Sequence, residues 1–223
     1  IEYLDKIIVS NDIVYNRLIN SGIDEKLIIK IPIGVDTSYF KPPSIEERLK
    51  ARSLFNFTDN DIVIGSFQKD GQGWKDGMKP KLIKGPDLFY KVVSKLNKNY
   101  KIKILLTGPA RGYLKNKLDE KKVSYFHSYL KNYEDLINFY HALDFYLITS
   151  REEGGPMGLL ESISSGIRVV STNVGMASDF IKNQEIGIIV KTSDPNIIAE
   201  KFKNYIQHGK SLGPNKIGRQ VIA

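Results

Sequence analysis

The hydrophobic pattern from residue 61 onward alternates between short apolar runs and longer stretches with helical periodicity. The apolar runs predict strands at 62–66, 102–107, 123–127, 145–149, 168–171 and 187–190. The stretches between them predict helices near 86–97, 112–120, 132–141, 157–165, 176–182 and 195–207. Strand–helix alternation at this spacing is typical of a parallel sheet with helices on both faces. We therefore predict a doubly wound α/β domain, which binds ligands at the carboxyl ends of its strands.

The first 60 residues carry a shorter version of this pattern. The run 7–9 predicts a strand, and Asn11 or Asp12 can cap a helix that follows it. A second apolar run covers 27–31, and a proline-rich joint at 41–43 leads into a charged helix from about Ser44. The joint predicts that these early elements are separated from the larger domain.

Composition excludes several kinds of site. The chain contains no cysteine, which excludes disulfides, thiolate nucleophiles and zinc bound by cysteine. Its three histidines are scattered without metal-ligand spacing, so we expect no metal. No apolar run approaches the ~20 residues of a membrane span, and no signal-peptide pattern is present.

The net charge of +8 is concentrated in one part of the chain. Residues 61–130 hold 15 basic and 6 acidic side chains, whereas the remainder is close to neutral. Two interpretations stay open: a solvated lysine face, or a site for a polyanion such as phosphate, a lipid headgroup or nucleic acid.

The connection after the first predicted strand of the large domain is long and rich in lysine. It runs from Gly65 to Pro86 and contains five lysines and the only tryptophan. One interpretation is a disordered insertion; the other is a functional loop, because loops of this length usually are. Its end, Lys84-Gly85-Pro86, opens a helix and leaves backbone N–H groups free to face an anion.

Two further strand-end loops carry weaker signals. Gly108 follows an apolar strand and permits close approach of a ligand to the backbone, but it belongs to no G-x-G-x-x-G fingerprint. No Walker-type Gly-Lys-Ser/Thr is present either. Tyr129 can stack on a base or cap the sheet, and the sequence alone favours the cap.

The most informative loop follows the strand at 145–149. Glu153 precedes Gly154-Gly155-Pro156, which turns into an apolar helix, and Glu161 lies about one turn inside that helix. The helix start offers unpaired N–H groups and a partial positive charge between the two carboxylates. This layout suits a ligand with phosphate in its middle and hydroxyls at both ends, as in a nucleotide sugar. The alternative is that Glu153 only caps the helix and Glu161 faces solvent.

The pair Glu153 and Glu161 resembles the E-x(7)-E motif of retaining glycosyltransferases of group 1 (family 4). The stretches 166–172, 174–176 and 31–36 are also similar to that family. The resemblance implies the C-terminal, nucleotide-sugar-binding half of a GT-B enzyme, with a Rossmann-like sheet.

The resemblance also implies a division of the chain. Residues 1–40 correspond to the end of an N-terminal domain and a linker, and 41–223 to the donor-binding domain without its final crossing helix. Because the chain starts at Ile1 rather than Met, we expect a piece of a longer protein. We expect this piece to bind nucleotide without transferring sugar.

The resemblance assigns roles by position. Glu161 corresponds to the ligand of the donor ribose, Glu153 to the residue facing the donor sugar, and Lys84 to the lysine on the diphosphate. The remaining expected donor-binding residues are Gly65, Gln68, Lys69, Gly108, Tyr129, Leu130, Gly155, Pro156, Met157, Gly158 and Leu159. One departure concerns the family's Gly-Arg pair, since Gly65 is followed by Ser66-Phe67-Gln68. Lys69 can replace the charge but lacks the bidentate fork of arginine.

The expected function is transfer of a sugar from a nucleoside-diphosphate sugar to an acceptor with retention of anomeric configuration, without a further cofactor. The acceptor is expected to be a glycan or lipid-linked saccharide, and no specific nucleic acid is expected as a partner. The expected location is the cytoplasm, with contact to the inner face of the membrane as a role for surplus lysines. The alternatives are a nucleotide-sugar epimerase, a glycogen or starch synthase, and a non-catalytic anion-binding module.

Overall fold

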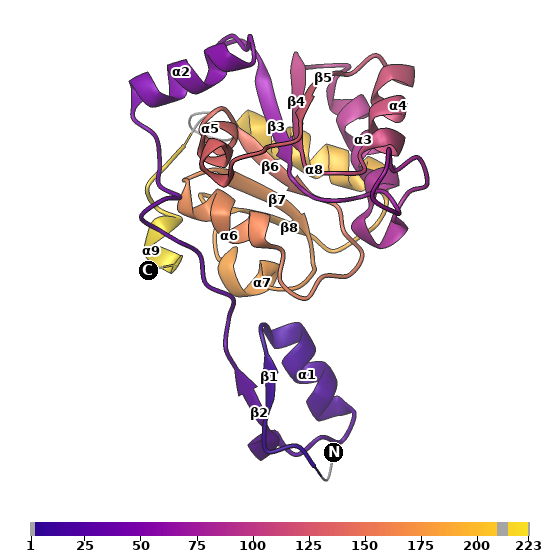
Figure 1. Ribbon diagram of the computed structural model, residues 1–223, viewed down its shortest axis with the longest axis vertical. Helices are drawn as coiled ribbons and strands as arrows, with labels where there is room; N and C mark the ends of the chain where they lie inside the picture. Colours follow the sequence, from indigo (N-terminus) through magenta and orange to yellow (C-terminus); the bar gives the residue numbers. More distant parts are fainter. Residues whose placement is uncertain (1–2, 209–213, 223) are drawn as a thin grey trace.

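A computed structural model describes residues 3–208 and 214–222 as a small lobe joined to a large one (Figure 1). Ile1, Glu2 and Ala223, at the ends of the predicted segments 1–40 and 41–223, lie outside the described residues. The small lobe consists of β1 (Ile7–Val9), α1 (Asp12–Asn20), a 3₁₀ turn (Glu25–Leu27) and β2 (Ile28–Lys30). Its two strands are parallel, and Asn11 caps α1 by accepting a hydrogen bond from the Val14 N–H.

The large lobe is built on a six-stranded sheet in which every neighbouring pair is parallel. Its strands, in chain order, are β3 (Ile62–Ser66), β4 (Ile102–Thr107), β5 (Ser124–Ser128), β6 (Phe145–Ile148), β7 (Arg168–Thr172) and β8 (Gly187–Val190). The spatial order is β5-β4-β3-β6-β7-β8, so the strand order reverses direction between β3 and β6. All six predicted strands are confirmed, with ends that shift by one residue at most.

Helices cover both faces of the sheet (Figure 1). They are α2 (Ile45–Leu54), α3 (Pro86–Leu96), α4 (Gly112–Glu120), α5 (Leu136–His141), α6 (Met157–Ser164), α7 (Ala177–Phe180), α8 (Pro195–His208) and α9 (Arg219–Ile222), with 3₁₀ turns at Leu82–Lys84 and Tyr133–Asp135. Neighbouring residues of one strand enter opposite cores: Val63 packs with α2, α5 and α6, whereas Ile64 packs with α3, α4 and α8. The central strands are therefore buried on both sides, and the doubly wound Rossmann-like fold is confirmed.

Two predicted helices are shorter than expected. The helix predicted at 132–141 begins only at Leu136, because Asn132 has extended backbone and the residues between form a 3₁₀ turn. The helix predicted at 176–182 covers only Ala177–Phe180, because the backbone of Ile181 leaves the helical region while its side chain enters the core.

An ion-pair network anchors α2 to the amino end of the sheet. The Asp144 carboxylate, just before β6, accepts from Arg48 Nη2 at 2.6 Å and from Arg52 Nη1 at 3.2 Å. It also accepts from the Val63 N–H of β3 at 2.8 Å. The Arg52 and Asp144 side chains are each only 3% exposed, so this network is shielded from solvent.

The segment between the lobes is anchored at its end, and the small lobe itself contacts the large lobe near the start of α1. At the end of the segment, the Phe40 side chain is buried, and its carbonyl accepts from Ser164 Oγ. In the small lobe, Ser10 Oγ and Asn11 Nδ2 both donate to the carbonyl of Gly154. Within the described residues no helix is long and apolar enough to cross a membrane.

Candidate functional site

A cavity of about 550 Å³ lies at the carboxyl ends of β3, β4 and β6. This is the edge of the sheet at which a doubly wound fold binds ligands. Eleven of the fourteen residues predicted from the sequence line it: Gln68, Lys84, Gly108, Tyr129, Leu130, Glu153, Gly155, Pro156, Met157, Gly158 and Glu161. The structure thus brings together residues from four loops that are far apart in the sequence.

The other three predicted residues do not line this cavity. Gly65 lies inside β3, where a Cβ atom would come within 2.5 Å of Leu143, so it serves packing. The Leu159 side chain is buried in the core, and its N–H donates to the Pro156 carbonyl at 3.0 Å rather than facing a ligand. Lys69 places its ammonium 3.6 Å from the centre of the Trp74 ring.

Lys84 and Glu153 form a direct ion pair in the lining of the cavity. The Lys84 ammonium lies 2.6 Å and 2.5 Å from the two carboxylate oxygens of Glu153, whose Oε1 also accepts from Ser150 Oγ at 2.7 Å. The sequence assigned the two side chains to separate parts of a ligand. In the structure they neutralise each other, so Glu153 is held by Lys84 and Ser150 rather than capping the helix.

The backbone next to Lys84, at Gly85, packs tightly against Thr149 at the carboxyl end of β6. Gly85 has φ +65° and precedes the start of α3, with Pro86 as the first helical residue. A Cβ at Gly85 would lie 1.9 Å from the Thr149 carbonyl oxygen, and Thr149 Oγ1 donates to the Gly85 carbonyl at 2.9 Å. The loops after β3 and β6 are therefore in direct contact beneath the ion pair.

Gly85→Ala is expected to lower the free energy of unfolding by about 3 kcal/mol, because left-handed backbone costs about 1–2 kcal/mol and overpacking adds about 1–3 kcal/mol. Gly73 is a matched control, since it has φ +75° but a Cβ added there would meet no atom within 4 Å. Urea denaturation of Gly73→Ala should show only the backbone cost. Equal losses for the two variants would contradict the packing role of Gly85.

The amino end of α6 lines the same cavity as Tyr129. Pro156 precedes the helix and no side chain caps it, so the N–H groups of Met157 and Gly158 are left without helical acceptors. Gly158 lies against the Tyr146 hydroxyl, which a Cβ would approach to 2.3 Å. The same hydroxyl accepts from the Phe67 N–H at 3.0 Å, which fixes the loop after β3 beside the helix start. An anion at this helix start is stabilised by the helix dipole.

Glu161 contributes a nearly buried carboxylate to the lining of the cavity. Its side chain is held by the Tyr140 hydroxyl, which donates to Oε2 at 2.5 Å, and the residue is only 8% exposed. Burial raises the pKa of Glu161, although hydrogen bonds from Tyr140 and Tyr133 partly offset that effect. Burial also raises the pKa of Tyr133 to about 12, with a further contribution from the Glu161 charge. The alternative that Glu161 faces solvent is therefore wrong.

Several residues of the site were not predicted from the sequence. They are Tyr133 and Tyr140 near Glu161, Ser150 at Glu153, and Tyr146 beside the start of α6. Aromatic residues in an apolar helix or strand are ordinarily interpreted as core, so the sequence provided no signal for the tyrosines. Tyr129, which the sequence favoured as a cap of the sheet, is 66% exposed and lines the cavity.

The described histidines do not line the cavity, although His127 bonds to the carbonyl of the lining residue Gly108; each is bonded to a backbone carbonyl oxygen. His127 contacts Gly108, His141 contacts Lys41, and His208 contacts Asn204. Within residues 3–208 and 214–222, no group of three or more histidine, aspartate or glutamate side chains could hold a metal ion.

Comparison with known proteins identifies relatives of the large lobe. A family model described as glycosyl transferases group 1 matches residues 80–217. The capsular polysaccharide biosynthesis glycosyltransferase CapM of Staphylococcus aureus is 27% identical over 142 residues, which are 57% of this chain and 37% of that protein.

Solved structures show the same fold. Sucrose-phosphate synthase from Thermosynechococcus elongatus superposes with a TM-score of 0.78 at 19% identity, over 98% of this chain and 53% of that one. Anabaena HepE in complex with UDP-glucose gives a TM-score of 0.77 at 17% identity, over 98% of this chain and 58% of that one. The chain therefore spans about half the length, or less, of these relatives.

Proposed function

Since the chain belongs to the family of glycosyl transferases group 1, we propose that its cavity binds a nucleoside-diphosphate sugar for transfer with retention of anomeric configuration. The observation that carries the proposal is that two carboxylates, a lysine and an uncapped helix start line one cavity. They are Glu161, Glu153, Lys84 and the start of α6, and Glu153 lies beside Lys84. Such a set can serve a ligand with a ribose, a diphosphate and a sugar.

Each part of the donor has a matching group. The Glu161 carboxylate can accept hydrogen bonds from both ribose hydroxyls, while Tyr129 and Leu130 flank the base. The free N–H groups at the start of α6, together with Lys84, face the diphosphate. Leu159, whose N–H is already bonded, takes no part in this assignment.

Binding of the diphosphate would rearrange the ion pair of Lys84 with Glu153. In the structure Lys84 is neutralised by Glu153. A diphosphate beside Lys84 competes for the ammonium, and Glu153 can then accept a hydrogen bond from a sugar hydroxyl. Gln68 also lines the cavity, and its carboxamide donates to the Lys84 carbonyl at 3.1 Å. Of the two lysines in the lining, Lys84 and Lys131, we assign Lys84 to the diphosphate, as the resemblance implies.

In the proposed reaction the bond between the anomeric carbon and the diphosphate oxygen breaks as the acceptor hydroxyl attacks from the same face. The acceptor proton passes to the departing diphosphate oxygen. Lys84 and the α6 N–H groups stabilise the charge that develops on that oxygen, and such electrostatic stabilisation often contributes more to an enzyme's rate than any other effect. Besides the protein, this scheme requires only the donor and the acceptor.

The division of the chain follows from the same proposal. Residues 1–40 would end an N-terminal domain and 41–223 would form the donor domain, in a cytoplasmic enzyme. The small lobe contacts the Gly154 carbonyl, next to Glu153. The acceptor in this proposal is a glycan or lipid-linked saccharide.

A thermal-shift panel of UDP-, GDP-, ADP- and TDP-sugars tests the donor site, beginning with UDP-glucose because HepE was solved with it. A ligand at about 100 times its Kd adds about 2.7 kcal/mol of stability, which raises Tm by about 5–10 °C for a chain of this size. Free glucose is the control and should cause no shift.

The opposite result has a distinct signature. If no nucleotide sugar shifts Tm while nucleic acid binds with a steep dependence on salt, the cavity is not a donor site. The anion-binding alternative would then be supported.

A further inference from the structure

The loop between β3 and the 3₁₀ turn before α3 is an ordered hairpin. Residues 70–81 are referred to below as the Trp74 hairpin. Gly71 and Pro80 form an antiparallel bridge, the Gln72 N–H donates to the Lys79 carbonyl at 2.8 Å, and the Lys81 N–H donates to the Asp70 carbonyl at 2.7 Å. The interpretation of this stretch as a disordered insertion is therefore wrong.

The base of the Trp74 hairpin is locked by a buried ion pair. Asp70 Oδ1 lies 3.1 Å from Arg111 Nε, and the two side chains are at most 1% exposed. Arg111 also donates to the carbonyl oxygens of Ser66 and Thr107, at the ends of β3 and β4. The hairpin is thus tied to two strands of the sheet.

Close backbone packing fixes the middle of the Trp74 hairpin as well. The Gly112 N–H donates to the Asp76 carbonyl at 2.6 Å, and the Tyr113 N–H donates to the Gly77 carbonyl at 3.1 Å. A Cβ at Gly71 or at Gly77 would lie 2.2 Å from the Ala110 carbonyl oxygen. The hairpin can approach α4 this closely only because glycine occupies these positions.

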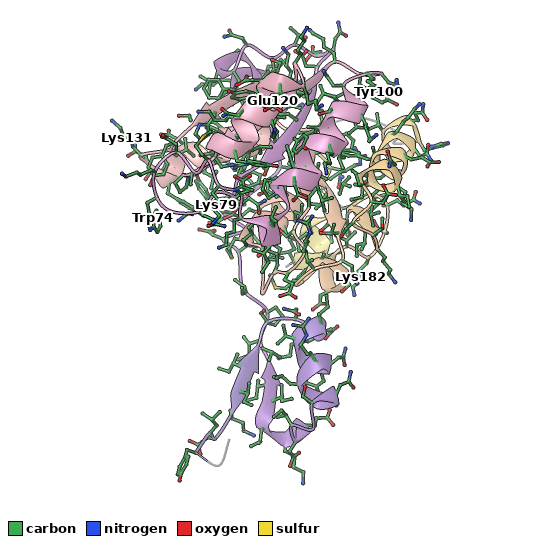
Figure 2. All side chains as sticks on the ribbon, turned by 90° about the vertical axis from the view of Figure 1, so that its right-hand side faces the viewer. Trp74, Lys79, Tyr100, Glu120, Lys131 and Lys182 are labelled. Atoms are coloured by element: carbon green, nitrogen blue, oxygen red, sulfur yellow. The ribbon has the colours of Figure 1, made fainter. Side chains whose placement is uncertain are left out.

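The fixed hairpin exposes two large apolar side chains. Trp74, the only tryptophan of the chain, is 81% exposed, and Met78 is 54% exposed. Figure 2 shows Trp74 at the edge of the large lobe, on the same side as Lys79 and Lys131. The ring contacts the Lys69 ammonium and is otherwise open to solvent, and an indole in this position suits an interface where its apolar body is covered and its N–H stays wet.

The charge around the tip is strongly positive. Four lysines surround Trp74 in the sequence, and one of them, Lys69, stacks its ammonium on the indole. They are Lys69, Lys75, Lys79 and Lys81. Asp70 is neutralised by Arg111, so Asp76 is the one acidic side chain left on the hairpin. This charge favours a surface of phosphates over a neutral saccharide.

We propose that the Trp74 hairpin docks the protein on an anionic lipid bilayer. Trp74 and Met78 enter the headgroup level, where amphipathic indole rings are favoured, and the four lysines contact lipid phosphates. Long lysine stems can lie along the apolar surface while their ammonium groups reach the headgroups. The proposal does not depend on the donor site, since neither Trp74 nor Met78 lines that cavity.

The sole tryptophan makes the test direct. Vesicles of phosphatidylcholine with 30% phosphatidylglycerol are added to the 223-residue chain, and tryptophan emission is recorded; that lipid fraction is on the order of the anionic content of natural leaflets. A blue shift, together with quenching by lipids brominated near the headgroup, is expected. Pure phosphatidylcholine should leave the spectrum unchanged. No shift with the anionic vesicles would overturn the proposal, as would an equal shift with neutral ones.

Variants separate this hairpin from general charge. The variant K69Q/K75Q/K79Q/K81Q is expected to lose about 100-fold in vesicle affinity, and W74A about 10-fold by cosedimentation, on the scale of a few lysine–lipid contacts. The matched control K95Q/K98Q/K121Q/K201Q removes the same charge elsewhere and should lose less than about 3-fold. Equal losses would show that net charge alone binds the vesicles and would contradict the hairpin. A far-UV circular dichroism spectrum and a urea midpoint equal to those of the unaltered chain show that W74A folds.

Discussion

Replacing Glu161 with alanine is expected to weaken binding of the nucleoside-diphosphate sugar about 100-fold. The carboxylate is almost fully buried and faces the cavity, so its hydrogen bonds to ribose hydroxyls would form away from bulk water. Hydrogen bonds to a charged group contribute about 1.5–3 kcal/mol each, and a 100-fold change corresponds to about 2.7 kcal/mol. Isothermal titration with the best donor from the thermal-shift panel measures the change.

The control for this variant is Glu200→Ala, because Glu200 is an exposed glutamate on α8 outside the cavity lining. Its affinity for the donor should equal that of the unaltered chain.

Acidification gives a second readout of the Glu161 assignment. Burial raises the pKa of Glu161, so affinity should begin to fall at a pH above the usual range of a glutamate. An unchanged affinity in Glu161→Ala would remove the ribose assignment.

Asp144→Ala is expected to lower the free energy of unfolding by about 3–5 kcal/mol, the usual cost of removing one partner from a buried ion pair. The substitution leaves Arg52 as an uncompensated charge in a site only 3% exposed, and it removes the acceptor of the Val63 N–H. Urea denaturation followed by circular dichroism measures this loss.

The matched control is Asp59→Ala, an exposed aspartate in the loop before β3, for which a change within about 0.5 kcal/mol is expected. Asp144 lies at the amino end of β6, opposite the cavity. The folded fraction of Asp144→Ala should therefore bind the donor normally. A loss as small as that of the control would show that water or a rearranged Arg48 compensates for the missing carboxylate.

The fold could be predicted from the sequence because local and global signals agree. Apart from β5, which reads Ser-Tyr-Phe-His-Ser, the strands of the large lobe are short runs rich in apolar residues. Turn residues and helical patterns separate these runs, so the local signals agree on each element. Asn11 and Ser44 cap α1 and α2 at the positions where the sequence predicts that helices begin. Predictions were less accurate where the backbone changes gradually, as in the 3₁₀ turn before α5.

Part of the candidate site could also be predicted, since parallel strands bring the loops at their carboxyl ends to one edge of the sheet. Which side chains pair across that edge could not. The ion pair of Lys84 with Glu153 joins two loops whose separation in sequence gives no indication of contact. The Tyr140 hydroxyl on Glu161 depends on the angle between α5 and α6, which no periodicity specifies.

The long loop after β3 shows why lysine-rich composition is a poor guide to order. Its residues resemble a solvated insertion, yet the Asp70–Arg111 pair and close glycine contacts hold it on α4. The arginine that does this, Arg111, is in a different loop and is fully buried. Order here depends on the charge of Arg111 and on the contact of Gly71 and Gly77 with the Ala110 carbonyl, and both of these partners lie outside the loop.

The strand order also determines when the site can form during folding. Of the strand pairs in the large sheet, β3 with β6 joins the most distant residues, since Ile64 pairs with Phe145. The halves β3–β4–β5 and β6–β7–β8 each close over shorter stretches, so we expect them to form first and the junction between them last. Lys84 and Glu153 lie on either side of that junction. A bound donor therefore bridges the last-formed contact of the sheet, and it should slow unfolding as well as shift its equilibrium.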